Sequence, residues 1–224
     1  MIPWSLLDTA QMPDDGGELR LFRRGSEFSI RLDRYELMNS RLTGSEEALA
    51  TVGCERIRSR ERPRILIGGL GMGFTLRAAL AALGPDARIV VAELVPAVLR
   101  WARGPMAEIF GPSLTDPRVD IREADVGSLI RSGPSAYDAI LLDVDNGPQG
   151  LTRKANDALY DLAGLSRARA TLRPGGVLGV WASAADVNFA RRLREAGFDV
   201  DEVRARANGS RGGARHVIWI ATRH

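Results

Sequence analysis

The pattern of apolar and polar positions changes after residue 62. From there on, short apolar runs alternate with longer amphipathic segments, as expected for parallel strands joined by helices. Predicted strands occupy residues 64–67, 88–93, 119–122, 137–143 and 177–181. Predicted helices occupy residues 74–83, 96–110, 156–171 and 185–196, with a helical turn at 128–132. This alternation predicts an α/β protein with a doubly wound, mostly parallel sheet.

The last two apolar runs, residues 198–206 and 216–222, are separated by a polar loop instead of a helix. A loop of that length suits an antiparallel pair, so we expect a sheet of seven strands that ends in such a pair. We divide the chain into a β-hairpin and helix appendage at residues 1–62 and a Rossmann-like domain at residues 63–224.

The appendage is expected to contain two short strands and one helix. Residues 18–22 and 27–32 alternate apolar and polar positions around a glycine-containing turn, which predicts a β-hairpin. The residues before the hairpin are rich in proline, aspartate and glycine, so we expect an extended lead-in there. A helix is predicted over residues 44–57, with Ser45 as its N-cap and acidic residues in its first turn.

A cluster of glycines follows the first strand of the main sheet. Gly69, Gly71 and Gly73 stand between that strand and the helix predicted to begin at Phe74. Glycine lets the backbone turn tightly and come close to a ligand, and a helix N-terminus offers unpaired N–H groups. This arrangement is typical of a nucleotide-binding site, although the glycines alone would also suit a tight turn without a ligand.

Acidic residues follow the other parallel strands. Ligands collect at the carboxyl ends of the strands in an open parallel sheet, so these acids are candidate site residues. Glu93, at the end of the second strand, can accept hydrogen bonds from both hydroxyls of a ribose. The alternative is an exposed acid at a helix start. Because Glu93 lies at a strand end, we expect its replacement to change folding stability little.

Asp143 and Asp145 follow the fourth strand, two residues apart. A carboxylate there can take a proton from an amine or hydroxyl nucleophile, or stabilise a nearby positive charge. Asp143 is the first choice for a residue at the reacting centre. The alternative is a structural turn, since Asp, Asn, Gly and Pro are all turn formers.

Composition narrows the class of protein. With 45% hydrophobic and 26% charged residues, it is that of an ordinary globular protein. The single cysteine excludes an intramolecular disulfide and a multi-cysteine metal site, and no apolar run approaches the roughly 20 residues of a membrane span. The 31 basic and 28 acidic residues are interspersed, which argues against nucleic-acid binding. The N-terminus does not read as a secretory signal. We expect a cytoplasmic protein without nucleic-acid or membrane partners.

The glycine turn, the strand–helix units and the closing antiparallel pair resemble the class I methyltransferase fold, over residues 64–224. In that fold the seventh strand is inserted antiparallel beside the fifth, and an aspartate after the third strand commonly accepts a hydrogen bond from adenine. Asp125 matches this aspartate, although it would also serve as a helix N-cap. NAD binding is an alternative for the glycines, but Phe74 occupies the place of the third glycine in that motif.

Within this fold, the chain resembles the spermidine and spermine synthases, which transfer an aminopropyl group from decarboxylated S-adenosylmethionine to a polyamine. The resemblance is carried by residues 31–33, 44–49, 67–73, 91–94 and 137–143. It implies that Asp143 is the catalytic base. The residues that it implies for binding the S-adenosyl nucleoside are Gly69, Gly71, Gly73, Glu93 and Asp125. Those that it implies for binding the substrate are Asp145 and Glu47.

Three departures from that family concern its amine-binding residues. Gly71 stands where the family has an aspartate that holds the donor's chain amine, and Asn146 replaces the second acid of its Asp-Ser-Ser-Asp motif. Its Tyr-His-Glu motif is reduced to residues 45–47, with only Glu47 retained. A polyamine carries at least two positive charges, so a site for it needs several carboxylates. We therefore expect weaker selectivity for the decarboxylated donor than in the family at large.

These observations predict a spermidine synthase-like transferase that transfers an aminopropyl group to an amine. The expected donor is S-adenosylmethionine or its decarboxylated form, without a metal. The expected partner is a small-molecule amine acceptor, with a homodimer as one candidate assembly. Two alternatives stay open, an S-adenosylmethionine-dependent methyltransferase and a non-catalytic member of the fold. Retention of Asp143 favours an enzyme, whereas the loss of accessory acids argues against the family's usual acceptor.

Overall fold

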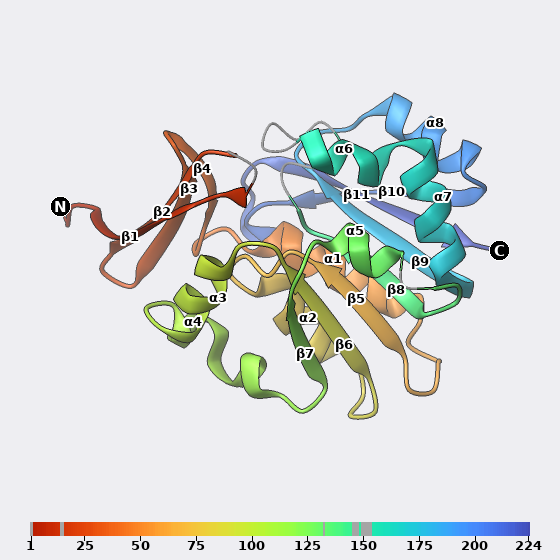
Figure 1. Cartoon of the computed structure of the whole chain (residues 1–224), viewed down its shortest axis with the longest axis horizontal. Coiled ribbons are helices and arrows are strands. Elements are labelled where there is room, and N and C mark those ends of the chain that lie inside the picture. The colour runs from red at the N-terminus through yellow and green to blue at the C-terminus, as the bar shows by residue number, and fades with distance from the viewer. Residues whose placement is uncertain (1, 14–15, 132, 145–147, 149–153) are drawn as a thin grey trace.

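Two β-sheets build the molecule, and Figure 1 shows the smaller one beside the larger one. The computed structural model describes residues 2–13, 16–131, 133–144, 148 and 154–224. The strands of the small sheet are β1 (Ser5–Gln11), β2 (Glu18–Arg24), β3 (Glu27–Leu32) and β4 (Tyr35–Asn39). The strands of the large sheet are β5 (Arg64–Gly68), β6 (Arg88–Glu93), β7 (Val119–Glu123), β8 (Tyr137–Leu142), β9 (Leu172–Ala182), β10 (Phe198–Arg206) and β11 (Arg215–Arg223).

The strand order of the large sheet is β10-β11-β9-β8-β5-β6-β7. Strands β5 to β9 pair in parallel, whereas β11 is antiparallel to both β9 and β10. The predicted α/β class is confirmed, with its mostly parallel seven-stranded sheet and the antiparallel strand beside the fifth. The order reverses between β5 and β8, and in open sheets of this kind such a reversal opens a crevice at the carboxyl ends of the strands.

Helices cover both faces of this sheet. They are α1 (Gly44–Glu55), α2 (Phe74–Ala82), α3 (Pro96–Arg103), α4 (Ala107–Phe110), α5 (Val126–Ile130), α6 (Lys154–Tyr160), α7 (Leu162–Thr171) and α8 (Val187–Glu195), with short 3₁₀ helices at Gly111–Thr115 and Gly209–Arg211. In the described part of the chain, no helix has both the length and the apolar character needed to cross a membrane.

Strand β5 lies between two hydrophobic cores. Ile65 and Ile67 pack in the core that contains residues of α1, α2 and α3, whereas Leu66 packs in the core that contains residues of α5, α7 and α8. Successive side chains of a strand point to opposite faces, so a strand covered on both faces has to be apolar throughout. This burial explains why residues 65–67 form a continuous apolar run.

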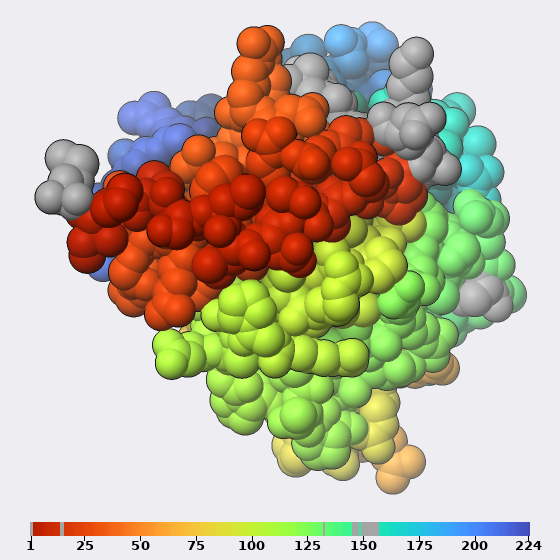
Figure 2. Space-filling model, turned by 60° about the vertical axis from the view of Figure 1, so that its left-hand side comes forward, coloured from red at the N-terminus to blue at the C-terminus, as the bar shows by residue number. Residues whose placement is uncertain are grey.

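The small sheet shares the first of these cores. Leu21, Phe28 and Ile30 on β2 and β3 are buried in it, and Figure 2 shows the red and orange N-terminal strands lying directly against the yellow-green residues that follow. The predicted hairpin is confirmed as β2 and β3. The predicted extended lead-in contains a strand that the sequence analysis did not assign, because residues 5–11 pair with β2 as β1. Strand β1 is largely exposed, so no alternating pattern marks it, and its Asp8 accepts a 2.6 Å hydrogen bond from Trp101 Nε1.

Several predicted boundaries change in the structure. The helix expected over residues 96–110 is divided into α3 and α4, and the one expected over 156–171 is divided at Asp161, which caps α7 by accepting from Gly164 N. Ser45 is not an N-cap, because it lies inside α1 and is fully buried. Helix α1 packs against α2 and β9, so it contributes to the core of the large sheet. The division of the chain after residue 62 stays a prediction.

Asp138 ties together three segments at the end of the large sheet opposite the crevice. Its side chain is 1% exposed and accepts hydrogen bonds from Arg60 Nη1 at 2.8 Å, Arg64 N at 2.8 Å and Arg173 Nη1 at 3.0 Å. We expect Asp138→Ala to lower the free energy of unfolding by about 2–4 kcal/mol, because it removes a buried carboxylate that accepts from two guanidinium groups and one backbone N–H. Urea unfolding measures this change.

Asp120 provides the control for Asp138. It pairs with Arg122 at 2.8 Å, but the Asp120 side chain is 56% exposed. An exposed ion pair contributes little, so Asp120→Ala should cost less than about 1 kcal/mol. Equal losses for the two variants would contradict the role assigned to Asp138.

Candidate functional site

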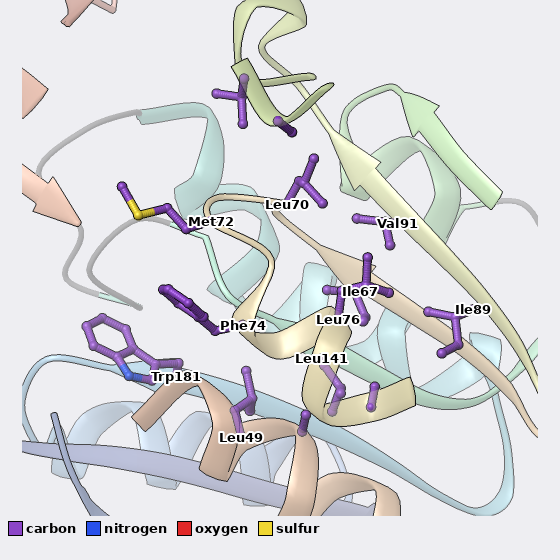
Figure 3. Packing of buried hydrophobic residues seen from close by; sticks show 14 of the residues in the cluster. Leu49, Ile67, Leu70, Met72, Phe74, Leu76, Ile89, Val91, Leu141 and Trp181 are labelled. Atoms are coloured by element: carbon purple, nitrogen blue, oxygen red, sulfur yellow. The ribbon is translucent and has the colours of Figure 1, made fainter. Parts of the chain in front are cut away.

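A cavity of about 170 Å³ lies at the carboxyl ends of β5, β6, β7 and β8. Segments that are far apart in the sequence line it, including the small sheet through Met12, Leu19, Ile30, Leu37 and Met38. Figure 3 shows Leu70, Met72 and Phe74 following one another along the glycine-rich turn and the start of α2, with Trp181 coming from β9. The sequence-predicted residues that line the cavity are Gly69, Gly71, Gly73, Glu93, Asp125 and Asp143.

The turn after β5 has to contain glycine at its first position. Gly69 has φ +88°, and a methyl group on it would overlap the carbonyl oxygen of Asp143. Two backbone hydrogen bonds of 2.9 Å fix this approach, from Gly69 N to Ala92 O and from Asp143 N to Gly68 O. The turn therefore lies against the ends of both β6 and β8, which brings the glycines and Asp143 to the same cavity.

The other two glycines shape the rest of the turn. Gly73 has φ +78° and precedes the first residue of α2, and a side chain there would overlap the ring of Phe110. Gly71 has φ +51°, and a methyl group on it would lie 3.1 Å from Met38 Sδ. The thioether of Met38 thus occupies the space into which a side chain at position 71 would extend.

Glu93 holds the glycine-rich turn to the end of β6. The residue is 6% exposed, and its carboxylate accepts from Leu70 N at 3.0 Å and from Val95 N at 2.8 Å. Burial raises the pKa of Glu93, while these backbone N–H groups oppose the rise. The alternative of an exposed acid at a helix start is wrong. The carboxylate borders the cavity, where a ribose hydroxyl would be a further donor to it.

Asp125 borders the cavity and caps a helix as well. It is the N-cap of α5 and accepts from Ser128 N at 3.2 Å, while Ser128 Oγ donates to the Asp125 carbonyl at 2.6 Å. Helix capping therefore accounts for an acid here, as the sequence allowed. Contact with adenine stays a prediction, which its place in the cavity lining supports.

Two carboxyl groups lie close together at one end of the cavity. Asp143 accepts a 2.6 Å hydrogen bond from Thr75 Oγ1, and Glu46 lines the same cavity. Burial raises the pKa of Asp143 to about 6, against the lowering effect of the Thr75 hydrogen bond. Burial first, and then the charge of Asp143, raise the pKa of Glu46 to about 7. At neutral pH the pair therefore holds its second negative charge weakly.

Sequence reasoning missed Glu46 and selected its neighbour. Glu47 is exposed and lies in a separate hollow that Arg77 and Phe110 also line, so the structure does not bring it to the cavity. Helix spacing places Glu46 on the same face as Leu49 and Ala50, which are buried one turn later, but the packing of α1 is needed to show that this face turns toward the cavity. Asp145, the other residue predicted to bind substrate, lies outside the described residues.

A polar chain fixes the Glu46 carboxylate. Ser45 Oγ donates to Glu46 Oε2 at 2.7 Å, and His216 Nδ1 lies 2.9 Å from the same hydroxyl oxygen. A hydroxyl has one proton, so His216 has to donate through Nδ1 when Ser45 donates to Glu46. Burial lowers the pKa of His216, which favours the neutral ring. The ring also packs edge-on against Trp181, with centroids 4.7 Å apart.

The groups that line the cavity suit an organic ligand. Among the described residues, no cluster of three or more His, Cys, Asp or Glu side chains is arranged to hold a metal ion. The cavity lining is mostly apolar and contains four carboxyl groups. Glu93 and Asp125 follow β6 and β7, and the other two belong to Glu46 and Asp143. Such a mixture of apolar walls and a few polar groups is common in small-molecule sites.

The fold and the cavity define a class I methyltransferase-like α/β protein whose ligand site is bordered by a small antiparallel sheet. No protein-family model matches the sequence. The sequence is similar to polyamine aminopropyltransferases. The one from Mycobacterium tuberculosis is 35% identical over 173 residues, which are 75% of this chain and 30% of that protein. Polyamine aminopropyltransferase 2 of Pseudomonas aeruginosa is 31% identical over 127 residues, 54% of this chain and 34% of that protein.

The aligned part thus covers about a third of the length of these relatives. Among solved structures, spermidine synthase from Thermotoga maritima has a TM-score of 0.77 at 17% identity, covering 98% of this chain and 73% of that one. A spermidine synthase in complex with the transition state analogue AdoDATO has a TM-score of 0.78 at 18% identity, covering 98% and 74%. These likenesses confirm the resemblance and the fold predicted from the motifs.

Glu93 makes a first prediction at this site. Glu93→Ala should lower the free energy of unfolding by about 1–3 kcal/mol without any ligand, because Leu70 N and Val95 N lose their acceptor in a buried position. This reverses the expectation from the sequence that a residue at a strand end would matter little for folding. Denaturant unfolding of the ligand-free protein measures it, and an unchanged midpoint would contradict the assignment.

The carboxyl pair makes a second prediction. Acids whose pKa is raised in the folded state bind extra protons there, so the free energy of unfolding falls as pH rises from about 4 to 7. Glu46→Gln removes one of these acids, so its melting temperature should exceed that of the wild type at pH 8 by about 2–4 °C. The difference should shrink at pH 5. Glu47→Gln, at the exposed neighbour, should match the wild type at both pH values.

Proposed function

We propose that this chain binds an S-adenosyl nucleoside in the cavity and transfers an aminopropyl group from decarboxylated S-adenosylmethionine to a small amine. One observation carries the proposal. A single cavity joins the glycine-rich turn, Glu93 and Asp125 to Asp143, which are the residues that the resemblance implies for the nucleoside and for the base. The names of the similar proteins support aminopropyl transfer.

The cavity residues fit such a donor. Gly69 and Gly73 let the turn pack against Asp143 and Phe110, which gives the part of the cavity beside the turn its shape. Glu93, already fixed by two backbone N–H groups, would accept from the ribose hydroxyls. Asp125 would accept from the adenine amino group. A buried, fixed carboxylate is a precise acceptor because it loses little conformational entropy when the ligand binds.

Asp143 would act as the base. In aminopropyl transfer, the amine's lone pair attacks the carbon next to the donor sulfur, the carbon–sulfur bond breaks, and its electron pair stays on sulfur, which becomes a neutral thioether. The acceptor enters as an ammonium, so it first gives one proton to Asp143, which frees its lone pair, and the product nitrogen keeps its two remaining protons. A pKa of about 6 suits this task, because the group is mostly ionised at neutral pH yet still basic enough to take a proton.

Methyl transfer is the second candidate, and Gly71 favours it. The resemblance implies an aspartate at this position for gripping the donor's chain amine, whereas here Met38 Sδ fills the space beside Gly71. A thioether does not bind an ammonium group as a carboxylate does. Competition between S-adenosylmethionine and its decarboxylated form for binding separates the two candidates.

The proposal also includes a small-molecule amine acceptor, a cytoplasmic location and a homodimer.

Asp143→Asn tests the function. It keeps the shape of the side chain and removes the base, so calorimetry should show methylthioadenosine affinity within about threefold of the wild type. Turnover with decarboxylated S-adenosylmethionine and a panel of polyamines should fall about 10²–10⁴-fold. Asp199→Asn, at an exposed residue of β10, should leave turnover unchanged. If the wild type binds no S-adenosyl nucleoside, the proposal is rejected, and equal turnover of the two variants would reject Asp143 as the base.

A further inference from the structure

The end of the cavity at Asp143 carries negative charge without a protein cation. Glu46 and Asp143 both line it, and none of the described residues that line the cavity is a lysine or an arginine. Ion pairs in the described part of the chain involve other acids. Both residues are half-buried, and two partly desolvated carboxylates without a counter-charge are unfavourable, so a protein that keeps both at one place gains from a cationic ligand there.

The polypeptide fixes both carboxylates instead of letting them turn to solvent. Thr75 Oγ1 donates to Asp143 Oδ2 at 2.6 Å and lies 3.4 Å from the carbonyl oxygen of Glu46, so the start of α2 connects the two residues. The Ser45 hydroxyl holds Glu46 Oε2 at 2.7 Å. In each residue one carboxylate oxygen is thereby occupied. The other oxygen of each carboxylate has lone pairs for a further donor.

Trp181 adds an aromatic wall to this end of the cavity, because its ring packs on His216, which contacts Ser45 beside Glu46. It is 8% exposed and lines the same cavity, and its indole N–H has no hydrogen-bond partner among the described residues. The walls nearby are otherwise apolar, with Phe74 and Met72 from the turn and α2. Apolar walls with two carboxylates at the end match an alkylammonium group.

We propose that Glu46 is a substrate-binding residue which, together with Asp143, holds the ammonium group of an alkyl amine acceptor at this end of the cavity. The proposal rests on the proposed function and deepens it by naming the residue that receives the amine. It also supplies a carboxylate for the amine in a chain that lacks several of the family's amine-binding acids. The resemblance implies Glu47 of α1 for substrate binding. The structure instead places the neighbouring acid of the same helix, Glu46, at the cavity.

The division of labour between the two acids follows from their surroundings. When the ammonium enters, its positive charge stabilises both ionised carboxylates. It thereby offsets the repulsion between Asp143 and Glu46, which adds to the effect of burial on the pKa of Glu46. One proton of the ammonium then passes to Asp143, and Glu46 keeps its charge and its hydrogen bond to the amine. Two acids are therefore needed, one to accept the proton and one to hold the nitrogen.

Calorimetry with defined amines tests this role. Wild type, Glu46→Gln and Glu47→Gln are saturated with methylthioadenosine and titrated with propylamine and with putrescine at pH 8. We expect Glu46→Gln to bind both amines roughly 10- to 100-fold more weakly, the range for a lost hydrogen bond to a charged group. Methylthioadenosine affinity should stay within about twofold in all three proteins. Glu47→Gln should bind the amines like the wild type, because Glu47 lies outside the cavity.

The outcomes separate this inference from the proposed function. Equal amine affinity in Glu46→Gln and the wild type, or no amine binding to the nucleoside-loaded wild type, overturns the role of Glu46 and leaves nucleoside binding standing. Failure of the wild type to bind methylthioadenosine rejects the proposed function instead. The titrations are therefore repeated without nucleoside. Weaker amine binding by Glu46→Gln, but not by Glu47→Gln, supports the inference there too. Equal amine binding by all three proteins overturns it. Melting curves at pH 8 confirm that each variant is folded.

Discussion

The close approach of Gly69 to the backbone of Asp143 is the constraint on which the site depends. No side chain fits between the turn after β5 and the end of β8, and the turn needs a positive φ at this point. Backbone hydrogen bonds to Gly68 and Ala92 then hold the ends of β5, β6 and β8 together. The cavity lies where the strand order reverses, because the chain after β5 continues to α2 on one face of the sheet and the chain after β8 continues to α7 on the other.

Buried carboxylates at this edge fall into two kinds. Glu93 is stabilised by backbone N–H groups of the turn and of the β6–α3 connection, so it supports the fold before any ligand arrives. Glu46 and Asp143 receive one hydroxyl each and repel one another. Their arrangement costs stability in the free protein, as is common where groups are placed for binding or catalysis. Partial or full burial of charge thus supports the fold at Glu93, whereas at Glu46 and Asp143 it raises the pKa of the carboxyl groups.

The small N-terminal sheet completes the site from outside the main fold. Its strands contribute Leu19, Ile30 and Met38 to the cavity lining, and the bond from Trp101 to Asp8 anchors its edge strand. Because this wall is apolar, it can exclude water from the end where charge would move. Excluding water strengthens the electrostatic interactions of the carboxyl pair with a ligand.

The sequence by itself determined the main sheet, the glycine-rich turn and the acids after each parallel strand, because hydrophobic period and glycine placement are local properties. It also determined that Asp143 and Glu93 would lie at one edge, since parallel strands all end there. It did not determine β1, whose pairing with β2 is long-range and leaves no alternating pattern. The choice between Glu46 and Glu47 was likewise decided only by the tertiary structure. Adjacent residues of a helix point about 100° apart, so only the packing of α1 against α2 and β9 decides which glutamate faces the cavity.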